Sequence, residues 1–167
     1  MARAIARKFN HHFVNTFAEP EGVLSQVPLL MSLKDPTKKM SKTGDEGIAL
    51  SDSADEIKRK IMAAVTASEA GKKTMPAGVK NLFVLLESFS PEDVPAFKKK
   101  YDAGSLQYAD LKSHLAQKII SHLKPLQDHF KQISDHRVEE VLDDGRHKAQ
   151  SIARATLHEV KEKIGLV

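Results

Sequence analysis

The stretch VPLLMSLKDPTKKMSKTG, residues 27 to 44, joins a short apolar run to a loop that carries four lysines. The apolar run, residues 27–33, is bounded by turn-forming residues at both ends, a pattern typical of a buried strand. The remaining periodic segments follow helical spacing. A lone strand cannot form a sheet, because its backbone donors and acceptors need neighbouring strands. We therefore predict a mainly α chain of one strand and six or seven helices, in which the strand lacks its neighbours.

Composition narrows the class of protein. The chain has 167 residues, of which 41% are hydrophobic and 29% charged, as expected of a folded protein. It has no cysteine, which excludes disulfide frameworks and thiolate chemistry and favours the cytoplasm. No apolar run is long enough to predict a membrane-spanning helix, so no membrane partner is expected, and no signal peptide is recognised. The net charge of +4 mildly favours an anionic partner such as a nucleotide or nucleic acid.

Helices are expected on both sides of the lysine loop. The first covers Ala2–Phe17, where apolar residues recur at helical spacing. Another begins near Ala54, since Ser53 and Glu56 have the spacing of a capping box. Apolar periodicity predicts a helix over residues 79–89.

The second half of the chain is expected to be entirely helical. Ser90 should cap a short helix that ends at Gly104, and Pro125 should kink a long helix over residues 108–134. Two further helical segments should flank Gly145.

The loop over residues 34–44 concentrates like charges. Lys38, Lys39 and Lys42 repel one another, and a bound polyanion such as a triphosphate would relieve that repulsion. Ser41 and Thr43 add hydroxyl donors on alternate residues. A ligand commonly binds where a loop leaves the carboxyl end of a strand. The alternative is an ordinary solvated basic turn.

The string KMSKT, residues 39–43, resembles the KMSKS motif of class I aminoacyl-tRNA synthetases. The approach LMSLKDPTKKMSKT resembles the tryptophanyl-tRNA synthetase branch in particular. Further segments are similar to that family in the same order along the chain: IALSDSADEIKRKIMAAVT, GVKNLFVLLE, YADLKSHLAQKIISHLKPL and VLDDGRHKAQSIARATLHEVKEKIG. The resemblance covers essentially the whole chain.

The resemblance implies a tryptophan–tRNA ligase that uses ATP with Mg²⁺ to activate tryptophan and transfers it to tRNA(Trp), as a homodimer when complete. It implies that Lys39 and Lys42 are catalytic, by stabilising charge on the leaving pyrophosphate. The nucleotide-binding positions that it implies are Leu30, Lys39, Met40, Ser41, Lys42 and Thr43, with the Leu30 backbone near the adenine. Met40 is expected to anchor the loop by packing. No metal site made by the chain's own side chains is expected.

The resemblance also implies a division of the chain. The implied fold is mainly α. Residues 48–167 would form a helical, bundle-like C-terminal domain that binds the anticodon. Residues 1–47 (helix, strand and KMSKS loop) would be the remnant of a Rossmann-type α/β catalytic domain that binds the nucleotide. Four basic residues of the last helices are candidates for tRNA phosphate contacts, although a solvated helix face explains them as well: Arg137, Arg146, Lys148 and Arg154.

Departures from the family pattern limit what this chain is expected to do. Thr43 replaces the last serine of the motif and keeps the hydroxyl, whereas Ala67 replaces an aspartate found in many relatives. The family's HIGH-like signature, amino-acid pocket and Gly-x-Asp-Gln segment have no counterpart in the sequence. We expect the isolated chain to be inactive as a ligase. The alternatives are a stand-alone helical RNA-binding module without ligase activity and, last, a helical scaffold without a ligand.

Overall fold

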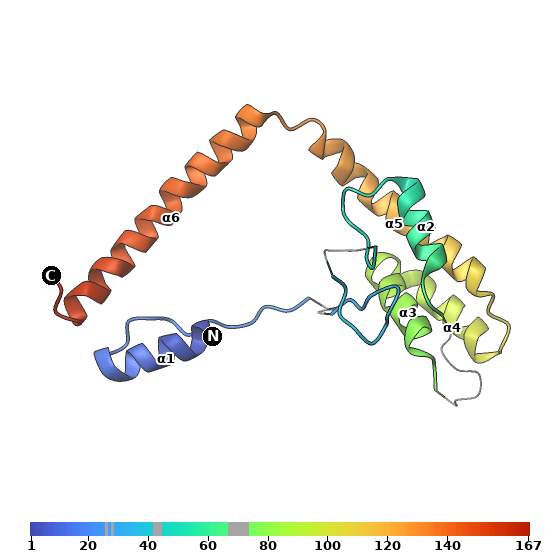
Figure 1. The fold of residues 1–167 in the computed structure, drawn as a ribbon, viewed down its shortest axis with the longest axis horizontal. Coiled ribbons are helices and arrows are strands. Elements are labelled where there is room, and N and C mark those ends of the chain that lie inside the picture. The colour runs from blue at the N-terminus through green and yellow to red at the C-terminus, as the bar shows by residue number, and fades with distance from the viewer. Residues whose placement is uncertain (26, 28, 42–44, 67–73) are drawn as a thin grey trace. The chain divides into compact units, whose positions relative to one another are not determined.

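The computed structural model describes residues 1–25, 27, 29–41, 45–66 and 74–167. The chain divides into two compact units (Figure 1). We call residues 24–132 the core unit, and residues 1–23 together with 133–167 the helix-pair unit. Regular structure in the described residues is helical apart from one isolated bridge, so the predicted mainly α fold is confirmed. No helix in the described parts is both long and apolar enough to span a bilayer.

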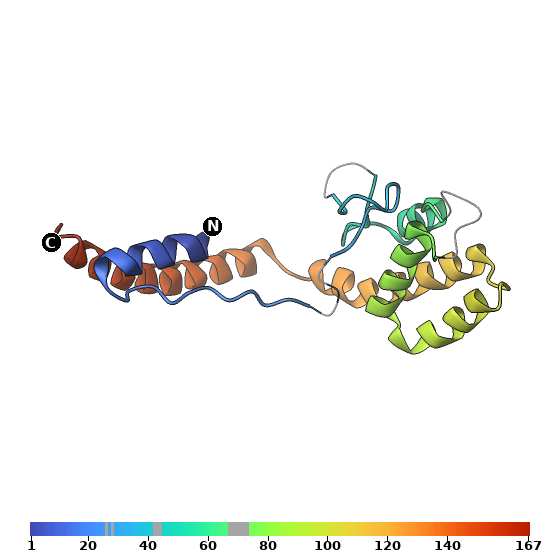
Figure 2. The same cartoon turned by 90° about the horizontal axis from the view of Figure 1, so that it is seen from below.

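The core unit is built around one long helix. Helices α2 and α3 pack against α5, and the short turn η1 joins α3 to α4 (Figure 1 and Figure 2). The bounds in chain order are α2 Ala54–Ala63, α3 Ala77–Phe89, η1 Pro91–Asp93, α4 Val94–Asp102 and α5 Tyr108–Phe130.

Apolar side chains at helical spacing form the core between these helices. Each helix buries one stripe, as expected when three amphipathic helices share a core. The largest fully buried apolar side chains are Ile57 and Ile61 of α2, Val79, Leu82, Leu85 and Leu86 of α3, and Leu111, Leu115 and Ile119 of α5. The core supports the lysine loop, because Leu33, Leu30 and Met40 pack against the same cluster.

Two local signals fix helix ends as predicted. The Glu56 amide donates to Ser53 Oγ, and the Ser53 amide donates to Glu56 Oε2, which completes the capping box of α2. Gly104 has φ +67°, the left-handed conformation expected where α4 stops. Pro125 lies inside α5, and the kink there stays a prediction.

The helix that was expected to start after Ser90 begins differently. Residues Pro91–Asp93 form a 3₁₀ turn before α4, and the Ser90 hydroxyl makes no bond to the backbone of that turn. It lies 2.5 Å from carboxylate oxygens of Glu92 and Asp93 instead. The helical turn starts where it was predicted, but the Ser90 hydroxyl bonds to two carboxylates and does not cap the backbone.

The helix-pair unit consists of α1, Ala2–Phe13, and α6, Asp135–Lys163. The prediction that the first helix reaches Phe17 was wrong. Val14 has φ 68° and ends it, and Asn10 Oδ1 then accepts hydrogen bonds from the Thr16 and Phe17 amides. Lys163 Nζ of α6 donates to Thr16 Oγ1 at 2.8 Å.

Helix α6 passes through Gly145 without a break, which corrects the prediction of two segments. A glycine inside a helix costs only about 1 kcal/mol relative to alanine, too little to end a long helix by itself. Ser134 Oγ caps the start of α6 by accepting from the Arg137 amide, and ion pairs three or four residues apart line its sides.

The apolar run at residues 27–33 is not a strand in its described part. It contributes one isolated antiparallel bridge, between Met31 and Lys39. The physical reason is the one that the sequence suggested, since a ladder needs neighbouring strands. The run is buried at its end, where Ser32 and Leu33 are inaccessible to solvent.

Candidate functional site: the lysine loop

The lysine loop comprises residues 34–44, and its described part, residues 34–41, folds back on the segment that precedes it. The Ser32 amide donates to the Lys38 carbonyl at 2.8 Å, and the Met40 amide donates to the Leu30 carbonyl at 2.9 Å. Between these bonds, Asp35 to Lys38 form a β-turn, closed by the Lys38 amide on the Asp35 carbonyl. Aspartate at the first position and proline at the second are the residues that favour this turn.

The four lysines of the loop differ in their electrostatic surroundings. Lys38 forms an ion pair with Asp35 at 3.1 Å, and Lys34 lies 3.9 Å from Asp45. Among the described residues, no carboxylate forms an ion pair with Lys39. Lys42 and Thr43, two of the predicted site residues, lie outside the described residues. Lys39 is therefore the described lysine of this loop that has no acidic partner among the described residues.

A hollow of about 660 Å³ lies beside the loop. It is lined from the loop side by Lys39, Met40 and Ser41, and by Leu30. The remaining lining residues are Val27, Gly47, Ile48, Ala49, Leu50 and Lys60. The structure thus brings the described members of the predicted site, Leu30, Lys39, Met40 and Ser41, to one cavity. A mostly apolar hollow with a cation and hydroxyl at its edge suits a nucleotide, whose base is apolar on its faces and whose phosphates are charged.

Met40 fixes the loop against the wall of the hollow. A Cβ built on Gly47 would lie 2.6 Å from the Met40 sulfur and nearer still to Met40 Cγ, so any side chain at residue 47 would force Met40 to move. Met40 also packs against the hydrophobic core. The contact matches the expected packing role of this side chain.

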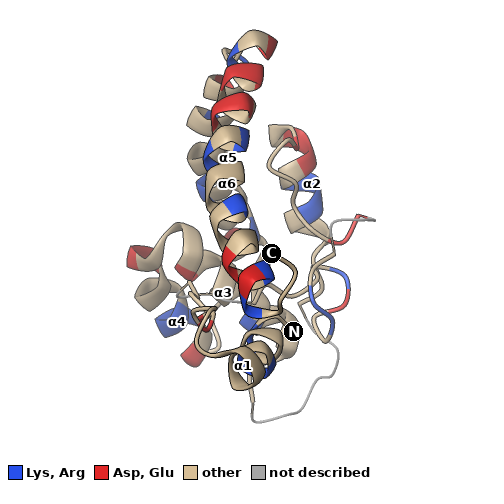
Figure 3. Ribbon diagram, turned by 90° about the vertical axis from the view of Figure 1, so that its left-hand side faces the viewer, with Lys and Arg blue, Asp and Glu red and all other residues tan. Residues whose placement is uncertain are grey.

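Asp45 anchors the loop where it returns to the helices. Arg59 of α2 holds its two oxygens at 2.8 and 3.1 Å, and this pairing lowers the pKa of Asp45 to about 2. Lys60, next along α2, lies 3.7 Å from Asp45 and 2.7 Å from Asp52. The bond to Asp52 raises the pKa of Lys60, so the ammonium stays charged. Acidic residues lie at the start of α2 and basic residues at its end (Figure 3), which also suits the helix dipole.

Comparison with known proteins assigns the chain to a family. The family model described as "tRNA synthetases class I (W and Y)" matches residues 1–124. The chain belongs to this family. The matched range includes the lysine loop and the core unit through most of α5, up to Lys124.

Individual members of this synthetase family are similar to the chain over its whole length. The chain is 38% identical to a tryptophan–tRNA ligase of Helicobacter pylori and 36% identical to one of Caldanaerobacter subterraneus, over all of this chain and 52% and 53% of those proteins. A solved tryptophanyl-tRNA synthetase from Mycoplasma pneumoniae superposes with a TM-score of 0.81 at 29% identity, covering 99% of this chain and 52% of that one. The chain spans about half the length of the relatives that it matches.

A second solved synthetase is a complex with ligands. This tryptophanyl-tRNA synthetase from Campylobacter jejuni, complexed with ADP and tryptophan, matches with a TM-score of 0.68 at 25% identity. The match covers 98% of the present chain and 52% of the Campylobacter jejuni chain.

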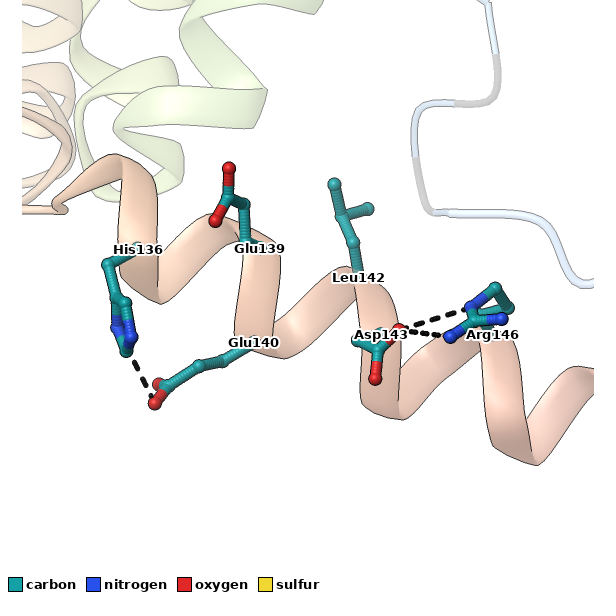
Figure 4. A pocket seen from close by; sticks show the side chains of 6 residues that line it. All are labelled: His136, Glu139, Glu140, Leu142, Asp143 and Arg146. Carbon is teal, nitrogen blue, oxygen red and sulfur yellow. Dashed lines mark hydrogen bonds and ion pairs between the residues drawn. The ribbon is translucent and has the colours of Figure 1, made fainter.

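The basic residues proposed for tRNA contact are mostly paired with neighbouring acids on α6. Arg137 lies 3.1 Å from Glu140, Arg146 pairs with Asp143, and Lys148 lies 2.6 Å from Asp144. In Figure 4, Arg146 and Asp143 reach each other along a single helix, beside a depression whose lining residues all come from α6. Arg154 forms no ion pair with a described residue. A depression with walls from one exposed helix encloses no ligand.

Three residues that position this synthetase loop were missed in the sequence: Asp45, Lys60 and Asn81. Asp45 and Lys60 look like ordinary surface charges in a polar stretch, so periodicity gave no signal. Asn81 did carry one, because it is a polar residue within the apolar run VKNLFVLL of α3. Asn81 is 5% exposed, and its Nδ2 donates to the Met31 and Ser32 carbonyls at 3.0 and 3.2 Å. A buried amide in an apolar stripe usually marks a required hydrogen bond.

Proposed function

We propose that this chain is part of a tryptophan–tRNA ligase, and that it supplies the lysine loop and the helical region that approaches tRNA(Trp). The observation that carries the proposal is the meeting of Lys39, Ser41 and Leu30 at one hollow, within the range matched by the synthetase family. Residues 1–47 would belong to the nucleotide-binding catalytic domain and residues 48–167 to the anticodon-binding domain.

The chemistry assigned to the loop follows from charge. Attack of the tryptophan carboxylate on the α-phosphate of ATP forms an aminoacyl-adenylate and releases pyrophosphate. Negative charge builds on the leaving pyrophosphate, so cations fixed beside it stabilise the transition state more than the ground state. Lys39 and Lys42 would supply those charges, and Ser41 and Thr43 would donate hydrogen bonds to the same phosphates.

The remaining parts of the site follow from the same proposal. The Leu30 backbone would meet the adenine at the apolar end of the hollow, and Met40 would hold the loop in register. ATP would enter as its Mg²⁺ complex, with the ion held by the phosphates rather than by side chains of this chain. The complete enzyme would act as a cytoplasmic homodimer away from membranes.

Nucleotide titration of the 167-residue chain tests the proposal. We expect ATP with Mg²⁺ to bind, and Lys39→Ala to weaken that binding about tenfold, the loss of one charge-assisted phosphate contact. Lys98→Ala is the matched control, because Lys98 pairs with Asp102 on α4 and should not affect ATP. Absence of ATP binding at millimolar concentration would contradict the proposal, as would equal affinities for wild type and Lys39→Ala.

Two further assays separate the alternatives. Tryptophan-dependent ATP–pyrophosphate exchange should be absent for this chain alone, because the sequence has no recognisable amino-acid pocket; robust exchange would refute that statement. The stand-alone RNA-binding module predicts salt-sensitive tRNA binding that is indifferent to alanine at Lys39 and Lys42. If tRNA binds in that way while ATP does not, the module replaces the ligase as the function.

A further inference from the structure

The lysine loop is tied to the helices of the core unit at both ends. Before the loop, Asn81 of α3 donates to the Met31 and Ser32 carbonyls. After the loop, Arg59 and Lys60 of α2 hold Asp45. The two attachments belong to different helices and use different chemistry.

Backbone bonds connect these two attachments to each other. The Leu33 amide donates to the Glu46 carbonyl at 2.8 Å, and the Leu33 carbonyl accepts from the Val65 amide at 2.9 Å. The loop therefore leaves and returns at one point, next to the end of α2. Its base is a closed ring whose position is set by the side chains on α2 and α3.

Burying the Asn81 amide costs free energy of folding, which its two hydrogen bonds to backbone carbonyls must offset. Its Oδ1 is buried and has no hydrogen-bond partner among the described residues. A leucine would fill a similar volume without a buried unpaired oxygen, and apolar groups are generally preferred there. The benefit of the asparagine lies in its two donors, which hold the carbonyls of the segment leading into the loop.

We propose that Asn81 and Asp45 are positioning residues that hold the lysine loop at its two ends, so that Lys39 and Ser41 face the phosphates of a bound nucleotide triphosphate. The choice of ligand rests on the proposed function; the attachment itself does not. Neither residue is assigned contact with the nucleotide. Each acts through the backbone of the loop.

Hydrogen exchange on the 167-residue chain tests the attachment without any ligand. In Asn81→Leu, we expect the Ser32, Leu33 and Met40 amides to exchange about tenfold faster, because their bonds close the ring that Asn81 holds. Amides of α5 should exchange as in wild type. Ser88→Ala is the control, since it removes a side-chain hydrogen bond from the same helix at an exposed position.

Asp45→Asn provides a second variant at the other end of the loop. It keeps the shape of the side chain and removes the charge held by Arg59, at a partly exposed site where folding should be unaffected. The Leu33 amide should again exchange faster. Asp128→Asn is its control, because Asp128 pairs with Lys124 on exposed α5 surface. Wild-type exchange at Ser32, Leu33 and Met40 in folded Asn81→Leu would overturn the proposal. If that variant does not fold, unchanged exchange at Leu33 in Asp45→Asn would overturn it.

A comparison of two nucleotides distinguishes positioning from general support of the fold. ATP should bind about tenfold more weakly to either variant, whereas AMP, which lacks the outer phosphates, should change less than about twofold. Equal losses for ATP and AMP would show a merely structural role and contradict the proposal. If wild type binds neither nucleotide, the proposed function fails, and the exchange measurement alone decides whether the residues hold the loop.

Discussion

The core unit and the helix-pair unit are both built from amphipathic helices, yet they use their apolar residues differently. The core unit buries one stripe from each of α2, α3 and α5. Helix α6 buries no side chain, and most of its large apolar residues are exposed, with Leu142 at 67% and Ile152 at 71%. Similar periodicity therefore gives a packed core in one region and an open apolar face in the other. The pattern states which side of a helix is apolar, but it does not supply the surface that covers it.

The largest effect should come from shortening a leucine in each region. Leu86→Ala should lower the free energy of unfolding by about 2–5 kcal/mol, because Leu86 is fully buried and the change leaves a cavity. Leu142→Ala on α6 should change it by less than about 0.5 kcal/mol. Denaturant titration followed by circular dichroism measures both. Equal losses would show that α6 is covered in solution and would break the comparison.

Breaking an ion pair should also destabilise the core unit more than the helix-pair unit. Lys60 and Asp52 are each 11% exposed and lie 2.7 Å apart, so Lys60→Met leaves a nearly buried carboxylate and should cost about 2 kcal/mol. Lys148→Met removes an exposed pair on α6 and should cost less than about 1 kcal/mol. Thermal and denaturant unfolding give the values. A larger loss at Lys148 would contradict the assignment of α6 as solvated surface.

Acid should act on the core unit through Asp93. Hydrogen bonds from Ser90, Lys118 and His114 hold its pKa well below the ordinary value of 3.8. Because the folded state binds this proton less readily than the unfolded chain, the contribution is complete above about pH 5 and declines as the pH falls through 3.8 and below. Unfolding measured between pH 6 and about 2 should therefore show a shallower loss in Asp93→Asn than in wild type. Parallel curves would show that Asp93 is not held in this way.

The smallest effect should be a gain at Gly145. Gly145→Ala should stabilise α6 by about 0.5–1 kcal/mol, because the residue is helical and a Cβ there meets no atom within 4 Å. Helicity by circular dichroism and the melting curve report the change. Ala149→Gly, one turn later on the same helix, should have the opposite sign. Destabilisation by Gly145→Ala would contradict a continuous α6 and would favour the two helical segments predicted from the sequence.

The sequence by itself determined the features that depend on a few neighbouring residues. The capping box of Ser53 and Glu56, the stop at Gly104 and the apolar stripes of α2, α3 and α5 were all predicted, since these signals act within one or two turns. The KMSKT string and its flanking segments also indicated the family, which the comparisons confirmed. Local signals failed where they were weak: a single glycine did not end α6, and Val14 ended α1 before Phe17.

Only the tertiary structure decided how the lysine loop is held. Asn81 and Met31 are 50 residues apart, Gln127 donates to the Leu50 carbonyl across 77, and Asp45 meets Arg59 only when α2 packs beside the loop. The sequence also did not show which lysines of the loop have acidic partners. In the structure, Lys34 and Lys38 have such partners, whereas Lys39 has none among the described residues. The physical reason is that these hydrogen bonds and ion pairs join groups far apart in the sequence, which folding brings within about 3–4 Å. Local spacing predicts a partner only within one or two turns.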